Sequence, residues 1–276
     1  MGGTRTLHDG SQLNDVWSTD DGDHWRQELA SAPWQPRWCS ALFAFADKLW
    51  LIGGLASVEP IHNLNDIWSS PDGKRWKREP AEAPWTARHV WAAAGHRGRI
   101  YLLGGATDGS HYYQDVLWSE DGVHWRSEAV VGPWFEKRKN LAAASHRDRL
   151  FLGGGSSIHP SPRLLNDVWA SRDGAHWTCV TSRAPWSARN VHVFLSYRDK
   201  LWLVGGEMGS AHYTNDLWST RDGESWVREA DGLTWLGRHS AGTVVFKDKV
   251  WVFGGTSTST GTSSRNDVWN FSSAAD

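Results

Sequence analysis

The chain has 276 residues, a formal net charge of −2, 12% aromatic residues and 22% charged residues. This balance, without a basic run, excludes nucleic acid as a general partner, and no apolar span reaches membrane length. Two cysteines, Cys39 and Cys179, make no disulfide framework, and MGGTRTLHDG is no signal peptide, so we expect a cytoplasmic protein unless a leader preceded this sequence.

A block that starts near Asp-Val-Trp-Ser and ends at Gly-Gly recurs without a gap. Only the segment between a Gly-Gly pair and the next Asp changes in length. A repeat period of about 50 residues indicates stacked supersecondary units, here within a single domain, 1–276. The blocks are 15–54, 66–105, 115–154, 167–206 and 216–255, followed by a partial repeat, 266–271.

Four short strands are predicted in each repeat. In chain order, the third strand of the unit comes first, at Asp15–Ser18, and the Asp21-Gly22 turn leads into a fourth strand that begins at Trp25. Arg37–Phe45 is the first strand of the next unit. The second, Leu49–Ile52, is apolar on both faces and is therefore expected to be buried on both. Four antiparallel strands per repeat predict a propeller blade.

Tryptophan marks the repeat. Fifteen of the 21 tryptophans occupy three repeat positions, where they are expected to cement neighbouring blades. The third copy departs from this pattern, because Asp115-Val116-Leu117-Trp118 places its Trp one residue later and so on the other face of the strand. Local repacking is the favoured explanation.

These features resemble the kelch repeat. The resemblance rests on Gly-Gly after the second strand, the aromatic residues of strands three and four, and segments such as Asn166–Trp169 (NDVW) and Ala184–Arg189 (APWSAR). It covers nearly the whole chain, although Trp replaces the usual Tyr of the third strand. The resemblance implies an all-β, kelch-type β-propeller of four-stranded antiparallel blades. It leaves function open, because the family contains enzymes, sugar binders and protein adaptors.

Strand counting favours five blades, and a six-bladed ring, the alternative, would lack three strands. We expect the ring to be closed by N-terminal and C-terminal strands, with the strand from Trp25 joining Ser240–Phe253. One copy of the third strand, Asp15–Ser18 or Asp267–Asn270, would then be surplus. Its displacement or exchange would give a monomer or a strand-exchanged dimer.

In a propeller, the loops between strands two and three and between strands four and one share the face around the central channel. A basic residue recurs there, three residues after the Trp that precedes strand one, and could bind an anion. Pairing with the repeat aspartates is the favoured alternative, because an unpaired buried charge is costly. This basic ring comprises Arg37, Arg88, Lys137, Arg189 and Arg238.

Positions that differ between copies are better candidates for a specific site. Strand alternation predicts one common direction for two sets, one and three residues beyond the ring. The first is Trp38, His89, Arg138, Asn190 and His239, and the second is Ser40, Trp91, Asn140, His192 and Ala241. Loop residues that could join them are His111, the pair Tyr112-Tyr113, Glu207, His212 and Tyr213.

Two functions follow from these residues. The favoured one is a binding module whose central pocket holds a small polar or anionic molecule, a sugar or an acidic peptide. The alternative is a cofactor-independent isomerase, lyase or cyclase, in which His89, His192 or His239 exchanges a proton and Glu136 or Glu207 orients it. No HxxxH or HxH spacing occurs, and the iron and copper motifs of kelch enzymes are absent, so we expect neither a metal nor a cofactor.

Overall fold

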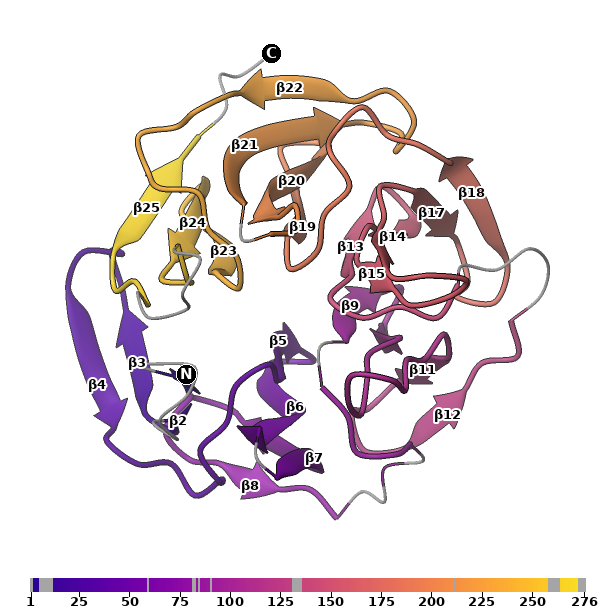
Figure 1. Ribbon diagram of the computed structural model, residues 1–276. Helices are drawn as coiled ribbons and strands as arrows, with labels where there is room; N and C mark the ends of the chain where they lie inside the picture. Colours follow the sequence, from indigo (N-terminus) through magenta and orange to yellow (C-terminus); the bar gives the residue numbers. More distant parts are fainter. Residues whose placement is uncertain are drawn as a thin grey trace. The chain divides into compact units, whose positions relative to one another are not determined.

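The computed structural model describes residues 2–4, 12–58, 60–80, 83, 85–89, 91–130, 136–210, 212–257 and 264–272. All regular elements in these ranges are β-strands (Figure 1). Within them, no helix has the length and hydropathy needed to span a bilayer. The chain divides into two compact units, the first comprising 1–130 and 136–139 and the second 131–135 and 140–276.

The first unit holds two four-stranded antiparallel sheets and two two-stranded sheets. One four-stranded sheet has the order β5 (Ala41–Phe45), β6 (Lys48–Val58), β7 (Ile61–Ser70) and β8 (Lys77–Arg78). The other joins β9 (Ala92–His96), β10 (Arg99–Leu103), β11 (Val116–Ser119) and β12 (Trp125–Ser127). The smaller sheets pair β1 (Gly3–Thr4) with β2 (Gln12–Leu13), and β3 (Val16–Thr19) with β4 (Trp25–Leu29).

The second unit repeats the same plan (Figure 1). Its first sheet joins β13 (Ala142–His146), β14 (Arg149–Gly153), β17 (Val168–Ser171) and β18 (Trp177–Thr181). Between β14 and β17 in the chain, β15 (Ser156–Ser157) and β16 (Arg163–Leu164) form a separate two-stranded sheet. The next joins β19 (Val193–Tyr197), β20 (Lys200–Glu207), β21 (Tyr213–Thr220) and β22 (Val227–Ala230). The last has three strands, β23 (Gly242–Phe246), β24 (Lys249–Phe253) and β25 (Val268–Phe271).

These four-stranded sheets and the three-stranded sheet are the blades of a five-bladed, all-β propeller, as the repeat predicts. Both copies of the third strand at the chain ends are paired, β3 with β4 and β25 with β24. Among the described residues, third strands outnumber each of the other strand types by one, as the strand count predicts. Neither terminal copy is displaced, because each pairs with a strand of its own terminal segment. Closure of the ring by the two terminal segments stays a prediction.

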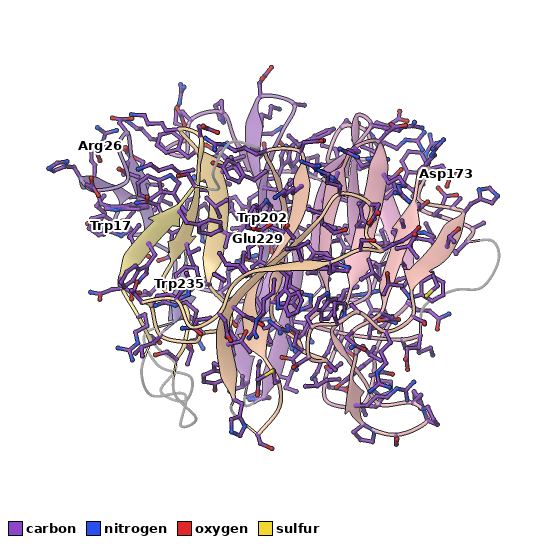
Figure 2. All side chains as sticks on the ribbon, turned by 90° about the horizontal axis from the view of Figure 1, so that it is seen from above. Trp17, Arg26, Asp173, Trp202, Glu229 and Trp235 are labelled. Carbon is purple, nitrogen blue, oxygen red and sulfur yellow. The ribbon has the colours of Figure 1, made fainter. Side chains whose placement is uncertain are left out.

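Side-chain hydrogen bonds shape the turn between the third and fourth strands. In the β17–β18 turn, Ser171 Oγ accepts a hydrogen bond from the amide of Gly174, which has a φ of 83°. Asp173 Oδ1 accepts a hydrogen bond from the amide of His176, and Trp177 Nε1 donates one to the Gly174 carbonyl. Figure 2 labels Asp173 at this exposed turn. The Ser-x-Asp-Gly-x-x-Trp run thus defines both the turn and the first residue of the fourth strand.

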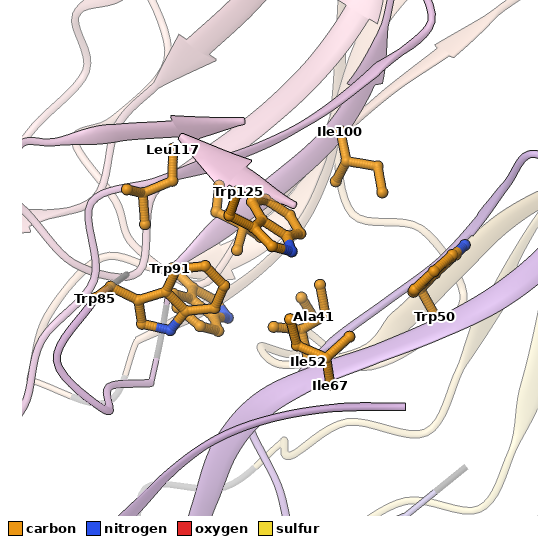
Figure 3. Close-up of a cluster of buried hydrophobic side chains, with 10 residues drawn as sticks. Ala41, Trp50, Ile52, Ile67, Trp85, Trp91, Ile100, Leu117 and Trp125 are labelled. Atoms are coloured by element: carbon orange, nitrogen blue, oxygen red, sulfur yellow. The ribbon is translucent and has the colours of Figure 1, made fainter. Parts of the chain in front are cut away.

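Second strands are buried on both faces, as their continuous apolar sequences predict. Leu150, Phe151 and Leu152 of β14 are each 0% exposed. In the first unit, Trp50 of β6 and Ile100 of β10 belong to one cluster of buried side chains, drawn in Figure 3. The core therefore lies between the faces of successive sheets.

The Gly-Gly pair connects successive sheets. Gly154 and Gly155 both have positive φ, and the amide of Gly155 donates to the carbonyl of Arg189 at the start of the next sheet. In this third copy the Gly-Gly pair ends at Gly155, one residue after the end of the predicted block 115–154. The sequence supplies the reason, since Trp134 and Arg138 are four positions apart whereas Trp and Arg are three apart in the other copies.

The displaced tryptophan of the third copy lies on the face that the sequence predicts. Leu117 is 3% exposed and packs in the same cluster as Trp125. Trp118 faces the other way, and the guanidinium carbons of Arg99 and Arg126 lie 3.9 Å and 5.2 Å from its ring centroid. Cation–π contacts thus hold the displaced Trp118 ring outside the core.

Candidate functional site

The arginines of the basic ring are buried and paired inside the protein. Arg189 is 1% exposed and binds Asp216 through two hydrogen bonds of 2.6 Å and 2.9 Å, and its Nη1 also donates to the Gly205 carbonyl. Burial raises the pKa of Asp216, but the hydrogen bonds and charge of Arg189 outweigh burial and lower it to about 2. The same pairing joins Arg37 to Asp66, Arg88 to Asp115 and Arg238 to Asp267. These guanidiniums therefore serve the blades, as the favoured alternative states.

Arg138, and not Lys137, occupies the ring position of the third copy. Arg138 is 1% exposed and its Nε donates to the Glu136 carbonyl, as Arg189 Nε does to Ser187, whereas Lys137 is exposed. The extra residue before Arg138 shifts every later position by one. Lys139 therefore corresponds to His89 and its equivalents, and a ligand contact through the buried Arg138 has no support.

Backbone geometry separates the two variable sets that alternation predicts to point together. Between them lies one residue with left-handed φ, such as Cys39 (51°), Asn140 (56°), Val191 (52°) or Ser240 (55°). Alternation holds only in extended backbone, so the residues on either side of this kink take different directions. The expected common direction is therefore wrong, and Asn140, placed in the second set, is itself a kink residue.

The second variable set points into the interfaces between sheets. Trp91 is 8% exposed and packs edge-to-face on Trp85, with ring centroids 5.8 Å apart (Figure 3). His192 is 5% exposed between Trp186 and Phe194, at 5.9 Å and 5.3 Å. Neither side chain is available to a ligand, so the catalytic assignment of His192 and the binding assignment of Trp91 have no support.

Burial of His192 predicts acid sensitivity. Burial and then the charge of Arg189 lower its pKa from 6.5 to about 3, and neither ring nitrogen has a hydrogen-bond partner among the described residues. Below pH 6.5 the His192 imidazole takes up a proton in the unfolded chain but stays neutral in the folded chain. The free energy of unfolding therefore decreases as the pH is lowered. At pH 5 this costs about 2 kcal/mol relative to pH 7.5.

Urea unfolding of the wild type and of His192→Phe between pH 7.5 and pH 5 tests this expectation. Trp91 fills the equivalent place in the first unit, so an aromatic hydrocarbon fits there. We expect the difference in unfolding free energy between the two proteins to change by about 2 kcal/mol over this range and to be constant above pH 7. A pH dependence that His192→Phe leaves intact would contradict the assignment.

Four members of the first variable set each open a row of three side chains. Antiparallel bridges pair the residue after the ring arginine with one that follows the Gly-Gly pair, and this residue pairs with one three positions before the repeat Asp. Directly opposed residues share one face, with Cβ atoms about 4.5–5.5 Å apart. We call these sets rim rows: Trp38–Leu55–Asn63, His89–Ala106–Tyr112, Asn190–Glu207–Tyr213 and His239–Thr256–Ser264.

The rim rows meet in the first unit. His89 Nδ1 lies 2.6 Å from Asn63 Oδ1, and Asn63 Nδ2 donates to the Thr107 carbonyl at 2.6 Å. Because a carbonyl only accepts, the Asn63 oxygen must face His89, and His89 must donate from Nδ1. Nε2 of the neutral ring is then an acceptor, and no described residue bonds to it.

A cation and an aromatic ring lie beside His89. Lys139 Nζ is 4.8 Å from the ring centroid of Tyr112, the third member of the His89 row. Burial and then the charge of Lys139 lower the pKa of His89 to about 4, against the opposing charge of Asp108. We call Asn63, His89, Tyr112 and Lys139 the first-unit cluster. At neutral pH it offers one cation, one imidazole acceptor and an aromatic face.

The structure distributes the other predicted residues. His111 Nδ1 binds Asp108 at 2.9 Å near the first-unit cluster, and the ring of Tyr113 lies under the Arg88 guanidinium at 3.6 Å. Trp38 is half-buried in the row that ends at Asn63, and Glu136 gives its carbonyl to Arg138. In the second unit, Asn190, Glu207, Tyr213 and His239 lie on rim rows, whereas His212 is exposed on the loop.

Two members of the first-unit cluster, Asn63 and Lys139, are absent from the sequence-based candidates. A signal for Asn63 exists, because it stands, like Tyr112, three residues before the repeat Asp, a position that differs between copies. Lys139 was missed because the extra residue of the third copy shifts the alignment, so that Arg138 was matched to His89 in its place. The described residues contain no group of three or more His, Cys, Asp or Glu side chains that could hold a metal ion.

Comparison with known proteins supports the architecture. A family model described as KLHDC2/KLHL20/DRC7 Kelch-repeats domain matches residues 91–275. No curated protein matches the chain. Since the matched segment covers more than half of the 276 residues and the sheets form kelch-type blades, the chain belongs to the kelch-repeat family.

Proposed function

We propose that the chain is a binding module whose first-unit cluster holds a small anionic molecule bearing a hydroxyl group. Kelch propellers are typically binding modules, and loops on such scaffolds carry the specific contacts. The observation that supports this proposal is the fixed tautomer of His89, which presents an acceptor nitrogen beside a lysine cation.

Each group of the cluster has a distinct task. The Lys139 ammonium pairs with a carboxylate, and His89 Nε2 accepts the hydrogen bond of a neighbouring hydroxyl. The face of Tyr112 supports the carbon skeleton between them. Hydroxy acids and sugar acids combine these three features.

Acid–base catalysis at the same place has weaker support. A His89 pKa of about 4 makes a poor base near neutrality, because an effective general base has a pKa close to the working pH. His192 is buried, and His239 lies on a row of the other unit. Binding is therefore the function that the geometry favours over isomerase, lyase or cyclase activity.

Calorimetric titration with gluconate and lactate tests the proposal, with propionate as the analogue that lacks a hydroxyl. We expect Lys139→Met to weaken hydroxy-acid binding at least tenfold, about the loss of one charge-assisted hydrogen bond, and His89→Phe to weaken it severalfold, the loss of one neutral hydrogen bond. Lys137→Met is the matched control, since Lys137 is exposed two residues away and outside the rim rows. Its affinity should stay within about twofold of the wild type.

Three results would overturn the proposal. One is equal binding of propionate and lactate, which would remove the task assigned to His89. Another is equal loss of binding in Lys137→Met and Lys139→Met, which would reduce the interaction to general charge attraction. The third is the absence of binding by any hydroxy acid or sugar acid.

A further inference from the structure

A second cluster of side chains lies on the rim row of β20 and β21 in the second unit. The amide of Asn190 donates to the Glu207 carbonyl and the amide of Glu207 to the Asn190 carbonyl, both at 2.9 Å. Glu207 also stands directly opposite Tyr213 in the strand register. The three side chains therefore share one face, with neighbouring Cβ atoms about 4.5–5.5 Å apart.

The next sheet completes this second-unit cluster. The ring of His239 lies 4.7 Å from the ring of Tyr213, centroid to centroid. His239 Nδ1 is 2.9 Å from Ser240 Oγ, and burial lowers the pKa of His239, so the imidazole is neutral at pH 7. The two aromatic rings thus lie against each other, and one of them, Tyr213, stands directly opposite Glu207 in the strand register.

Acceptors without donors define the chemistry of the second-unit cluster. Asn190 Oδ1 is buried and has no hydrogen-bond partner among the described residues. Among the residues that the structure describes, the Glu207 carboxylate also makes no hydrogen bond or ion pair. Burial, and then the charge of Glu207, raise the pKa of Tyr213. A buried acceptor without a donor costs about 1–3 kcal/mol, which a ligand N–H would recover.

We propose that the second-unit cluster binds the primary ammonium group of a small organic amine. Glu207 is the counter-ion, Asn190 Oδ1 accepts one N–H, and the Tyr213 ring faces the cation. An N–H donor is required because the buried amide oxygen needs a hydrogen bond, which a quaternary ammonium ion lacks. This site is independent of the first-unit cluster, whose Lys139 carries the opposite charge.

Titration calorimetry and NMR titration with n-butylammonium chloride test the proposal. Tetramethylammonium chloride of equal concentration is the probe without N–H groups, and potassium chloride controls for ionic strength. We expect n-butylammonium to bind, and tetramethylammonium to bind at least tenfold more weakly because it cannot satisfy Asn190. Equal binding of the two ammonium ions, or no binding of either, would overturn the proposal.

Three variants separate this site from general charge attraction. Glu207→Gln should weaken n-butylammonium binding at least tenfold, and Asn190→Asp should strengthen it severalfold by adding a second anionic acceptor. Glu224→Gln removes an equal charge from an exposed turn of the same unit and should change affinity less than twofold. Unchanged binding in Glu207→Gln, or equal losses in the two glutamine variants, would contradict the assignment. Lys139→Met should leave amine binding unchanged, so this proposal and the hydroxy-acid proposal fail separately.

Discussion

Arg189→Met is expected to destabilise the protein by about 3–5 kcal/mol, the usual cost of leaving one member of a buried ion pair alone. Asp216 is 7% exposed, and without Arg189 its carboxylate keeps only neutral donors such as Trp218 Nε1, 2.8 Å away. The variant also leaves the Gly205 carbonyl without its 3.0 Å guanidinium donor. Urea unfolding at pH 7 measures the loss.

Arg198→Met is the matched control for this experiment. Arg198 pairs with Asp248, but the two side chains are 32% and 67% exposed, and exposed pairs contribute about 0–1 kcal/mol. Adding Asp216→Asn to Arg189→Met should restore part of the lost stability, because it removes the unpaired charge and keeps an acceptor for Trp218. Equal losses in Arg189→Met and Arg198→Met would contradict a structural role for the buried ring.

Repetition is why the sequence predicts so much of the fold. The turn of Ser171 to Trp177 is defined by local hydrogen bonds, and the burial of Leu150–Leu152 by a continuous apolar run. Such features depend on neighbouring residues and so recur wherever the sequence recurs. The terminal strands were harder, because the choice of partner for β3 and β25 depends on the relative stability of alternative pairings, which no local pattern encodes.

The candidate site was predicted less well, for two physical reasons. Alternation fails at the left-handed kink residues, so Trp91 and His192 turn into the core while His89 stays on the rim. One extra residue before Arg138 then placed Lys139 at the position equivalent to His89. The sequence does predict that a site uses positions that differ between copies. His89, Glu207 and Tyr213 occupy such positions.

Gly122→Ala is the second large effect expected, because this turn glycine meets a buried ring of the neighbouring sheet. A Cβ at Gly122 would lie 2.4–2.6 Å from three atoms of the Trp50 indole, far inside van der Waals contact. Trp50 is 1% exposed and its Nε1 is bonded to the Phe45 carbonyl at 3.0 Å, so the ring has little room to move. Overpacking of this kind costs about 1–3 kcal/mol, in addition to the roughly 1–2 kcal/mol of left-handed backbone strain at a φ of 78°.

Gly73→Ala isolates the contribution of the indole. Gly73 occupies the equivalent turn of the preceding sheet with a φ of 74°, yet its Cβ would meet only Leu49 Cδ1 at an ordinary 3.5 Å. Thermal and urea unfolding should therefore show the backbone cost in both variants and the packing cost in Gly122→Ala alone. Trp50→Leu should reduce the penalty of Gly122→Ala, a coupling that a double-mutant cycle measures. Equal losses of unfolding free energy in Gly73→Ala and Gly122→Ala, or no coupling to Trp50, would contradict this explanation. Glycine would then be required in these turns only for its backbone conformation and not for contact with the ring of the adjoining blade.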